Sequence, residues 1–538
     1  MTNPRKDHPE RARFTGPAAP VASQRSERRA VHSPVPGAAR KPLRVMKFGG
    51  TSVGDAACIC RVVEIVRDAL RESAVVVVVS AMSGVTNQLA EAARQSELGC
   101  EQPVAEILEQ LRQRHRTAAH ELMQSPDGRS RLHTKIDELI RAGSRLCQGT
   151  NRLGELTPRV RDEISSLGER LSVLLVAAAL AERGVASAAI DAAEIVVTDG
   201  AHGAAEPCME LTQKRCAVQV RPLLQHGVVP VVTGFIGATA DGVVTTLGRG
   251  GSDYSATILG AALAADEVII WTDVDGLQTA DPKLVPGART LAEVSYREAA
   301  ELAYFGAKVL HPKTLRPVMR CGIPLWIRNT FAPLKRGTRI TPKGLPGSGM
   351  TAITAIGEAA LISIGGPGWA GVPDLAGRSL RALAAVRADV LLLSQASSQN
   401  GVSLVIPAAQ SKVALEALRR EFARDLFAHD LPRGQTDHFR IDPTLSLVTV
   451  VGKNMSSVPA LVASAFGALG RAGVNVVAVA QGSSDCTLSF AVPGRDMKAA
   501  LLGVHGETQL GIPAFVGFEP GAEACHPVPT MPQPDPIQ

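Results

Sequence analysis

The sequence predicts an α/β fold with a mostly parallel sheet, followed by two copies of a smaller α+β unit. Three observations support this prediction. Short apolar strands alternate with helices over the first two thirds of the 538-residue chain. Residues 75–79 are five consecutive valines, as expected of a strand that is buried on both faces. The last third contains an internal repeat, in which Gln395 and Gln481 occupy equivalent positions 86 residues apart.

The first βα unit is expected as a strand over residues 43–48 and a helix over residues 56–70. Lys47 lies near the end of the strand, and two glycines, Gly49 and Gly50, follow it. Glycine has no Cβ, so the backbone at this turn can approach a ligand closely. The turn is therefore a candidate site for a phosphate.

The valine strand leads into residues 80–87, which are small and polar. Ligands of parallel sheets bind above the carboxyl ends of the strands, so this exit is a second candidate for ligand contact. Residues 88–150 are charged and loosely patterned, and we interpret them as an inserted helical hairpin without chemistry. The helix expected over residues 164–180 has Glu169 near its start, where a glutamate is more often a solvated first-turn residue than a ligand.

Residues 242–276 are the most informative stretch, because they read as strand, glycine turn, helix, strand and polar turn. The turn Gly248-Arg249-Gly250-Gly251 opens onto a helix that Ser252 or Asp253 would cap. The start of a helix offers free N–H groups to an anion, and Arg249 adds a fork suited to a carboxylate or phosphate. On this stretch alone, a tight turn without a ligand remains an alternative.

The remaining elements complete the α/β part. A strand is expected over residues 228–237 and a helix over residues 295–310. Lys308 lies on this helix and could either extend along its apolar face or reach a phosphate. Residues 332–350 are rich in glycine, proline and basic residues and predict a linker between domains.

The net charge of +6 comes from the N-terminal segment. Residues 1–44 hold ten Lys and Arg against three Asp and Glu, so the rest of the chain is close to neutral, which argues against nucleic-acid binding. This segment has no secretory pattern, and we expect a disordered tail, with an organellar transit peptide or an over-long start as alternatives. Nine cysteines without metal-ligand spacing favour free thiols and a cytoplasmic location. No apolar run reaches membrane-spanning length.

Four motifs, in order along the chain, resemble those of the aspartokinase family, which phosphorylates the side-chain carboxylate of L-aspartate with ATP. The repeat resembles the paired ACT regulatory domains of that family, and the match covers about residues 43–515. Both parts look closest to the kinase half of bifunctional aspartokinase–homoserine dehydrogenases. The four motifs are Lys47-Phe48-Gly49-Gly50-Thr51-Ser52, Leu247-Gly248-Arg249-Gly250-Gly251-Ser252-Asp253-Tyr254, Trp271-Thr272-Asp273-Val274-Asp275-Gly276 and Phe305-Gly306-Ala307-Lys308-Val309-Leu310-His311-Pro312.

The resemblance implies a three-layer α/β/α amino-acid kinase sandwich and two ferredoxin-like ACT domains. Because little chain follows the repeat, we expect a monofunctional enzyme. The expected parts are a disordered tail at 1–42, the catalytic domain at 43–331, a linker at 332–350, ACT domains at 351–435 and 436–520, and a disordered tail at 521–538.

The resemblance also implies roles for individual residues. Lys47 would offset charge between the phosphates and the attacking carboxylate, Arg249 would clamp a carboxylate of aspartate, and Glu169 would hold its ammonium group. Asp253 completes the expected catalytic set. Further expected contacts are Ser80, Thr86, Ser252 and Asp253 to aspartate; Lys47, Gly49, Gly50, Thr272, Asp273, Leu277, Lys283 and Lys308 to ATP; and Asp389, Gln395, Asn475 and Gln481 to a regulatory effector.

The expected ligands are ATP with Mg²⁺, L-aspartate, and threonine or lysine as effector. Mg²⁺ would be carried mainly by phosphate oxygens, so we expect no metal ligands in the protein. A homodimer or homotetramer is expected, with neither nucleic acid nor membrane as a partner. The chain departs from the family at Leu277, where an aromatic is frequent, and at Lys283, where Arg is common. Asp389 places a carboxylate near the effector's own, which makes the first effector site an open question.

The sequence disfavours four alternatives. A kinase of another acid, such as glutamate, is disfavoured by Glu169 and the Lys47 motif. A catalytically inert amino-acid sensor would be expected to lack Lys47, Arg249 or Asp253, and all three are present. A dinucleotide-binding oxidoreductase and a P-loop kinase lack their glycine motifs in this chain.

Overall fold

The computed structural model describes residues 41–306, 309–345, 349–365, 372–395, 401–423, 439–455, 459–482, 485–507 and 510. Lys308, nearly all of the tail expected at 1–42, the tail expected at 521–538 and the boundary expected between 435 and 436 lie outside these residues.

The N-terminal part of the described chain is built on an eight-stranded sheet with the order β3-β4-β2-β1-β7-β9-β10-β8. Every neighbouring pair is parallel except β9 with β10, so the predicted mostly parallel sheet is confirmed. The strands are β1 (Leu43–Phe48), β2 (Ala74–Val79), β3 (Ser187–Ile190), β4 (Val229–Thr233), β7 (Glu267–Thr272), β8 (Glu293–Ser295), β9 (Leu325–Asn329) and β10 (Thr338–Thr341).

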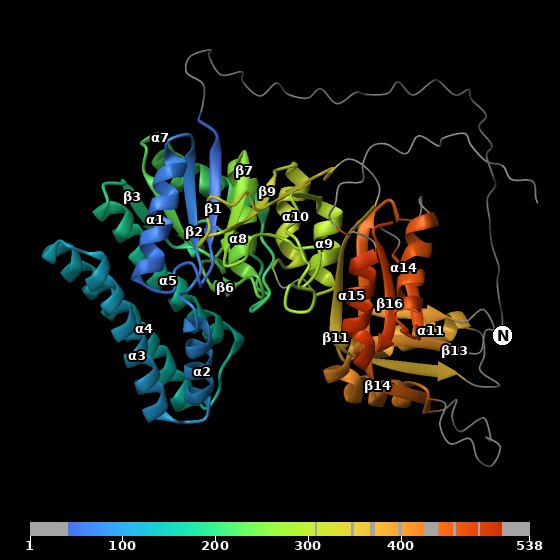
Figure 1. Ribbon diagram of the computed structural model, residues 1–538. Helices are drawn as coiled ribbons and strands as arrows, with labels where there is room; N and C mark the ends of the chain where they lie inside the picture. Colours follow the sequence, from blue (N-terminus) through green and yellow to red (C-terminus); the bar gives the residue numbers. More distant parts are fainter. Residues whose placement is uncertain are drawn as a thin grey trace, which may run out of the picture. The chain divides into compact units, whose positions relative to one another are not determined.

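Helices cover both faces of this sheet, which gives three layers (Figure 1). The valines of β2 show why that strand has no polar side: Val75, Val77 and Val79 lie in one core, and Val76 and Val78 in the other. The first core includes α1 (Ala56–Leu70) and α5 (Pro158–Glu182), and the second includes α6 (Met209–Gln219), α8 (Gly251–Leu263), α9 (Tyr296–Tyr304) and α10 (Pro312–Cys321). The short α7 (Arg221–Gln225) follows α6.

The insert after β2 has three helices, so the prediction of a hairpin is wrong. They are α2 (Val85–Glu97), α3 (Glu101–Leu122) and α4 (Pro126–Leu153). The insert also contacts the turns that follow β1 and β2: the Arg114 guanidinium of α3 donates to the carbonyls of Ser83 (2.8 Å) and Gly54 (3.0 Å). The first helix was missed because it starts directly at the polar exit of β2, where Gly84 turns the chain with φ of 83°.

Two strands expected in the main sheet are shorter and lie partly elsewhere. The segment 228–237 is divided into β4 and β5 (Ile236–Ala238), and β5 pairs with β6 (Val244–Thr246) as a separate antiparallel ribbon. The division falls at Gly234, where a Cβ would lie 2.7 Å from the Ser252 Cβ, and at Phe235, whose φ is 65°. The residues of 242–247 are apolar because the ribbon packs on the domain core, so their pattern did not distinguish the two arrangements.

The segment 332–350 is only partly a linker. Its residues 338–341 form β10, which pairs with β8 and β9 in the main sheet. The next strand, β11, already begins at Gly349. Glycines and prolines around these short strands masked their apolar positions.

The C-terminal part has a six-stranded sheet with the order β12-β13-β11-β14-β16-β15. Exchanging the two sequence repeats reverses this order, so the repeat corresponds to an internal two-fold pattern, and the copies pack together. The strands are β11 (Gly349–Gly365), β12 (Leu392–Gln395), β13 (Gly401–Pro407), β14 (Phe439–Lys453), β15 (Ala478–Gln481) and β16 (Thr487–Pro493).

Each half of this sheet has its own helical core, and β11 and β14 contribute to both. One core contains α11 (Val372–Ala385) and α12 (Ser411–Glu421), with Ile362 of β11 and Phe439 of β14. The other contains α14 (Pro459–Arg471) and α15 (Met497–Glu507), with Ile353 of β11 and Val450 of β14. The second helix of each half was not predicted from the repeat.

Among the described helices, α5 alone has the length and apolar composition that a membrane span requires, and most of it is buried inside the fold, as in core helices generally. The eight cysteines in the described part of the chain are all free thiols.

The core of the insert contains a buried histidine, His115 of α3, whose side chain is fully buried. Its Nδ1 lies 2.7 Å from the Leu111 carbonyl, and burial lowers the pKa of the imidazole to about 4. The unfolded chain therefore takes up a proton near pH 6.5 that the folded chain takes up only near pH 4.

We expect the free energy of unfolding to fall by about 2 kcal/mol between pH 7 and pH 5 from this group. Urea denaturation at both pH values measures the change. In His115→Asn, which keeps a hydrogen-bond donor but does not titrate, that part of the loss should disappear. An equal loss in the variant would show that His115 is not its source.

Candidate functional site

A cavity of about 370 Å³ opens at the carboxyl ends of β1 and β2. It collects residues from segments far apart in the sequence, as a ligand site in a parallel sheet does. The predicted residues that line it are Lys47, Gly50, Ser80, Thr86, Glu169, Ser252 and Asp253. These positions span more than 200 residues of sequence, and the fold brings them to one place.

An ion pair between Lys47 and Asp253 lies in this cavity. Lys47 Nζ is 2.5 Å from Asp253 Oδ1, and only 8% of the lysine is exposed. Asp253 is in the first turn of α8 and makes no capping hydrogen bond, so the prediction that Ser252 or Asp253 caps this helix is wrong. Gly250 is the N-cap residue, with φ of 70°, and the carboxylate of Asp253 is used to hold Lys47 instead.

The glycine turn after β1, Gly49-Gly50, lies next to the Lys47 ammonium group. A Cβ at Gly49 would be 3.4 Å from Lys47 Nζ, and a Cβ at Gly50 would be 2.9 Å from the Ala81 carbonyl oxygen. The Gly49 N–H donates to the Trp271 carbonyl at the end of β7, which joins this turn to the neighbouring strand. Gly50 is therefore required by close approach, whereas a Cβ at Gly49 would make only an ordinary contact.

Glu169 is buried, with 3% of its surface exposed. It lies in the middle of α5, since that helix begins at Pro158, so the view that it is a solvated first-turn residue is wrong. Burial raises the pKa of its carboxyl to about 8, although the Ala81 backbone and Lys47 act in the opposite direction. Its Oε2 is buried and has no hydrogen-bond partner in the described residues. A buried carboxylate oxygen without a partner indicates a place for a donor that binds from outside.

The neighbouring Gly168 explains how Glu169 reaches the cavity. A Cβ at this position would lie 2.7 Å from the Ala81 Cβ. Its absence lets α5 approach the exit of β2, and the next residue then projects into the cavity beside Lys47.

Arg249 does not line the cavity with the other predicted residues. Its exposed side chain lines an adjoining hollow of about 680 Å³, and Gly250 and Asp253 line both spaces. Arg249 thus lies beside the cavity, on a turn in which two of the three glycines, Gly248 and Gly250, have φ of 78° and 70°.

The residues expected to bind ATP are only partly brought together. Thr272 ends β7, which pairs with β1, so Thr272 and the exposed Asp273 adjoin the Gly49 turn. Lys283 is exposed on a later loop. The Leu277 side chain is buried in the core, its N–H donates to Thr338 Oγ1 and its carbonyl accepts from the Leu291 N–H, so it has no free group for a nucleotide.

The four regulatory positions fall at equivalent places in the two halves of the C-terminal sheet. Asp389 precedes β12 and Asn475 precedes β15, while Gln395 and Gln481 end those strands. All four are exposed. Asp389 is held by Gln410, which accepts from its N–H at 2.7 Å and donates to its Oδ2 at 3.2 Å.

Several residues at the site were not found from the sequence. Phe235 lines the cavity, and Asp162 and Arg114 support its walls from α5 and α3. The glycine before Phe235 marked a turn, but nothing in the linear pattern shows which wall a turn will form. In the described residues, no group of three or more His, Cys, Asp or Glu is arranged to hold a metal ion.

Residues 42–329 match the amino acid kinase family. This chain belongs to that family. Two further segments, residues 362–422 and 448–507, match the ACT domain, and each falls in one half of the C-terminal sheet.

Relatives place the chain in the aspartokinase branch of the family. Lysine-sensitive aspartokinase 3 of Escherichia coli is 32% identical over 468 residues, which cover 86% of this chain and 98% of that protein. The bifunctional aspartokinase/homoserine dehydrogenase of Haemophilus influenzae is 32% identical over 479 residues, or 86% of this chain and 56% of that protein. The chain thus spans about half the length of the bifunctional relatives it matches.

Solved structures agree with this placement. E. coli aspartokinase III in complex with aspartate and ADP superimposes with a TM-score of 0.72 at 29% identity, covering 86% of this chain and 99% of that one. The same enzyme in complex with lysine and aspartate gives a TM-score of 0.69 at 30% identity, covering 87% and 99%. The described fold is therefore that of an aspartokinase, with an amino acid kinase domain and ACT domains.

Proposed function

We propose that this protein is an aspartokinase, which transfers the γ-phosphoryl group of ATP to the side-chain carboxylate of L-aspartate and forms 4-phospho-L-aspartate. On this proposal it catalyses the first step of lysine, threonine and methionine biosynthesis. The observation that carries the proposal is the cavity at the ends of β1 and β2, where a buried lysine and a buried glutamate with a free oxygen lie together.

The charges at the site suit an acidic amino acid. Glu169 Oε2, which has no partner in the described part of the chain, would accept the α-ammonium group, and Arg249 beside the cavity would bind a carboxylate of the substrate. The hydroxyl-bearing residues of the cavity wall, Ser80, Thr86 and Ser252, would complete the substrate contacts.

Lys47 would provide most of the transition-state stabilisation. An aspartate carboxylate is already deprotonated at neutral pH, so its oxygen can attack the γ-phosphorus without a general base, and the bond to ADP breaks. What the reaction needs is alignment of two anions and neutralisation of the charge between them. Asp253 pairs with Lys47 in the cavity, and the Gly49 and Gly50 turn would bring backbone close to the phosphates.

The residues of the cavity fit Mg²⁺ that arrives bound to ATP. The carboxylates lining it are Glu169 and Asp253, and Asp253 is already paired with Lys47. This donor set leaves the ion to phosphate oxygens and water, as Mg²⁺ commonly binds. When bound, the ion would neutralise phosphate charge, while Lys47 acts on the transferred group. Thr272 and Asp273 at the end of β7 are the proposed nucleotide contacts on the protein side.

We further propose that an amino acid bound by the ACT domains regulates the kinase, with threonine or lysine as the effector. Phe305, at the end of α9, packs in a cluster with Leu392, Leu447 and Ala491 on the face of the C-terminal sheet opposite its helices. Its carbonyl also accepts from Thr354 Oγ1 of β11. Phe305 lies three residues before Lys308, which the family resemblance assigns to the nucleotide, so a shift of the sheet would reach the ATP site. The homodimer or homotetramer and the cytoplasmic location stay predictions.

The test of the proposed activity is ATP turnover by the full chain with L-aspartate and Mg²⁺, with the acyl phosphate trapped by hydroxylamine. We expect turnover with L-aspartate and much less with L-glutamate, and partial or full inhibition by threonine or lysine. Glutamate turnover equal to that with aspartate would reassign the substrate, and no turnover with either acid would contradict a kinase function.

Removal of the Lys47 ammonium group should lower kcat by a factor on the order of 10²–10³, because one preorganised cation at the transferred phosphoryl group is lost. Lys47→Ala tests this, with Lys135→Ala, an exposed lysine on α4, as the control expected to keep wild-type kcat. A wild-type kcat in Lys47→Ala would remove the proposed role.

The raised pKa of Glu169 predicts a pH dependence for aspartate. Only the ionised carboxylate attracts the ammonium group, so kcat/KM for aspartate should rise about tenfold per unit as pH increases toward 8 and then level off. In Glu169→Gln, kcat/KM for aspartate should be low and should not rise with pH. Glu163→Gln on the same helix, where Glu163 pairs with Arg170, should keep it. A flat wild-type profile between pH 6 and 8 would show that Glu169 does not hold the ammonium group.

A further inference from the structure

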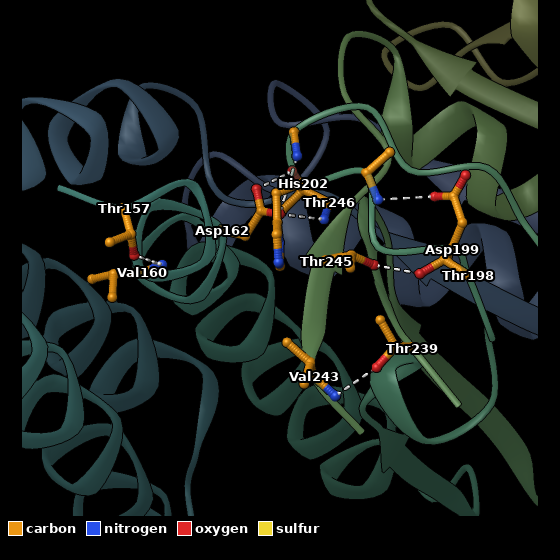
Figure 2. Close-up of polar contacts among 12 residues, drawn as sticks. Thr157, Val160, Asp162, Thr198, Asp199, His202, Thr239, Val243, Thr245 and Thr246 are labelled. Atoms are coloured by element: carbon orange, nitrogen blue, oxygen red, sulfur yellow. Dashed lines mark hydrogen bonds and ion pairs between the residues drawn. The ribbon is translucent and has the colours of Figure 1, made fainter. Parts of the chain in front are cut away.

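Asp162, outside the cavity, is a buried acceptor for four hydrogen bonds. It lies on α5, and 3% of its surface is exposed. Its Oδ2 accepts from His202 Nδ1 (2.8 Å) and from the backbone N–H groups of Gly203 (3.1 Å) and Thr246 (3.2 Å). Its Oδ1 accepts from Thr246 Oγ1 (2.6 Å). Figure 2 shows this carboxylate between the His202 loop and the ribbon strand that carries Thr246.

The two segments held by Asp162 support the Arg249 turn. Thr246 is the last residue of β6 and lies three residues before Arg249. The loop at Gly203 packs under the same turn, because a Cβ on Gly248 would be 2.7 Å from the Gly203 carbonyl oxygen. The Ala205 N–H also donates to the Thr246 carbonyl (3.0 Å). The Asp162 carboxylate therefore joins the two segments at the base of the turn.

The same helix carries Glu169. Seven residues separate it from Asp162, which is about two helical turns, so both side chains leave the same face of α5. A helix within the core is rigid over this length. The helix α5 thus fixes the position of Glu169 directly and the position of the Arg249 turn through Asp162.

We propose that Asp162 is a positioning residue that sets the place of the Arg249 turn relative to Glu169, and so controls the binding of the acidic amino acid. This proposal rests on the proposed aspartokinase function. Asp162 does not line the cavity and has no contact with the substrate in this scheme. Its loss would displace the carboxylate clamp and leave the Lys47–Asp253 pair and the Gly49 turn in place.

The test measures KM for aspartate and for ATP in Asp162→Asn. The amide cannot accept all four donors, so we expect the KM for aspartate to rise about tenfold or more and the KM for ATP to change by about twofold or less. Thr245→Val is the matched control, since Thr245 is on the same strand and its hydroxyl bonds to Thr198 (2.6 Å) on the side away from Asp162. It should lower stability and leave the KM for aspartate unchanged.

A double-mutant cycle separates positioning from a general structural role. If Asp162 acts through Arg249, Asp162→Asn should add little to the KM for aspartate in an Arg249→Ala background. Additive effects in the cycle, or an unchanged KM for aspartate in the single variant, would overturn the proposal.

Two further outcomes are distinguished by the design. If Asp162→Asn does not fold, Thr246→Val, which removes only the bond to Oδ1, decides the question. It should raise the KM for aspartate by about threefold, and no change would count against the proposal. If the wild-type protein turns over aspartate but the variants bind it normally, the positioning proposal fails alone. If the wild-type protein does not turn over aspartate, the proposed function fails and this proposal with it.

Discussion

The ion pair between Lys47 and Asp253 is the contact on which the proposed site depends. Two opposite charges, both mostly removed from water, meet where β1 ends and α8 begins. Neither charge is stable there without the other, since a buried charge that loses its partner costs several kcal/mol. The pair therefore holds the start of α8 against the end of β1, and the cavity is the space left between them. An arriving phosphate would enlarge a network of charges that already exists.

The remaining charges of the cavity are arranged around that pair. Glu169 has a buried oxygen with no hydrogen-bond partner among the described residues, and burial raises the pKa of its carboxyl to about 8, so an ammonium group that binds there would favour the ionised carboxylate. Such preorganisation costs stability in the free protein and reduces the reorganisation needed when a ligand binds. The helix α5 has a central part in this arrangement, because it carries both Glu169 and the buried Asp162 that supports the opposite wall.

The C-terminal sheet joins the two halves of the repeat. Its long strands β11 and β14 each contribute to the helical cores of both halves. The equivalent positions Asp389 and Asn475 precede the edge strands of this shared sheet. Asp389 is tied to Gln410 through its backbone N–H and its Oδ2.

The sequence by itself determined the parallel sheet, the helices α1 and α8, the repeat and most residues of the cavity. Local signals carry these features: five valines leave no polar face, glycines next to Lys47 permit close approach, and an offset of 86 residues is visible without a structure. The four motifs are also specific enough to indicate the family.

Tertiary structure alone decided the partners of the polar groups. Asp253 had the position of a helix cap, yet it pairs with a lysine more than 200 residues away. The local sequence around Glu169 predicts a solvated residue in the first turn of a helix. In the structure α5 starts earlier, at Pro158, and passes beside the exit of β2, so Glu169 is buried. Arg114, Asp162 and Phe235 have no local signature. Their contacts arise from how separate elements pack, and hydrogen bonds between distant segments leave no periodic pattern in the chain.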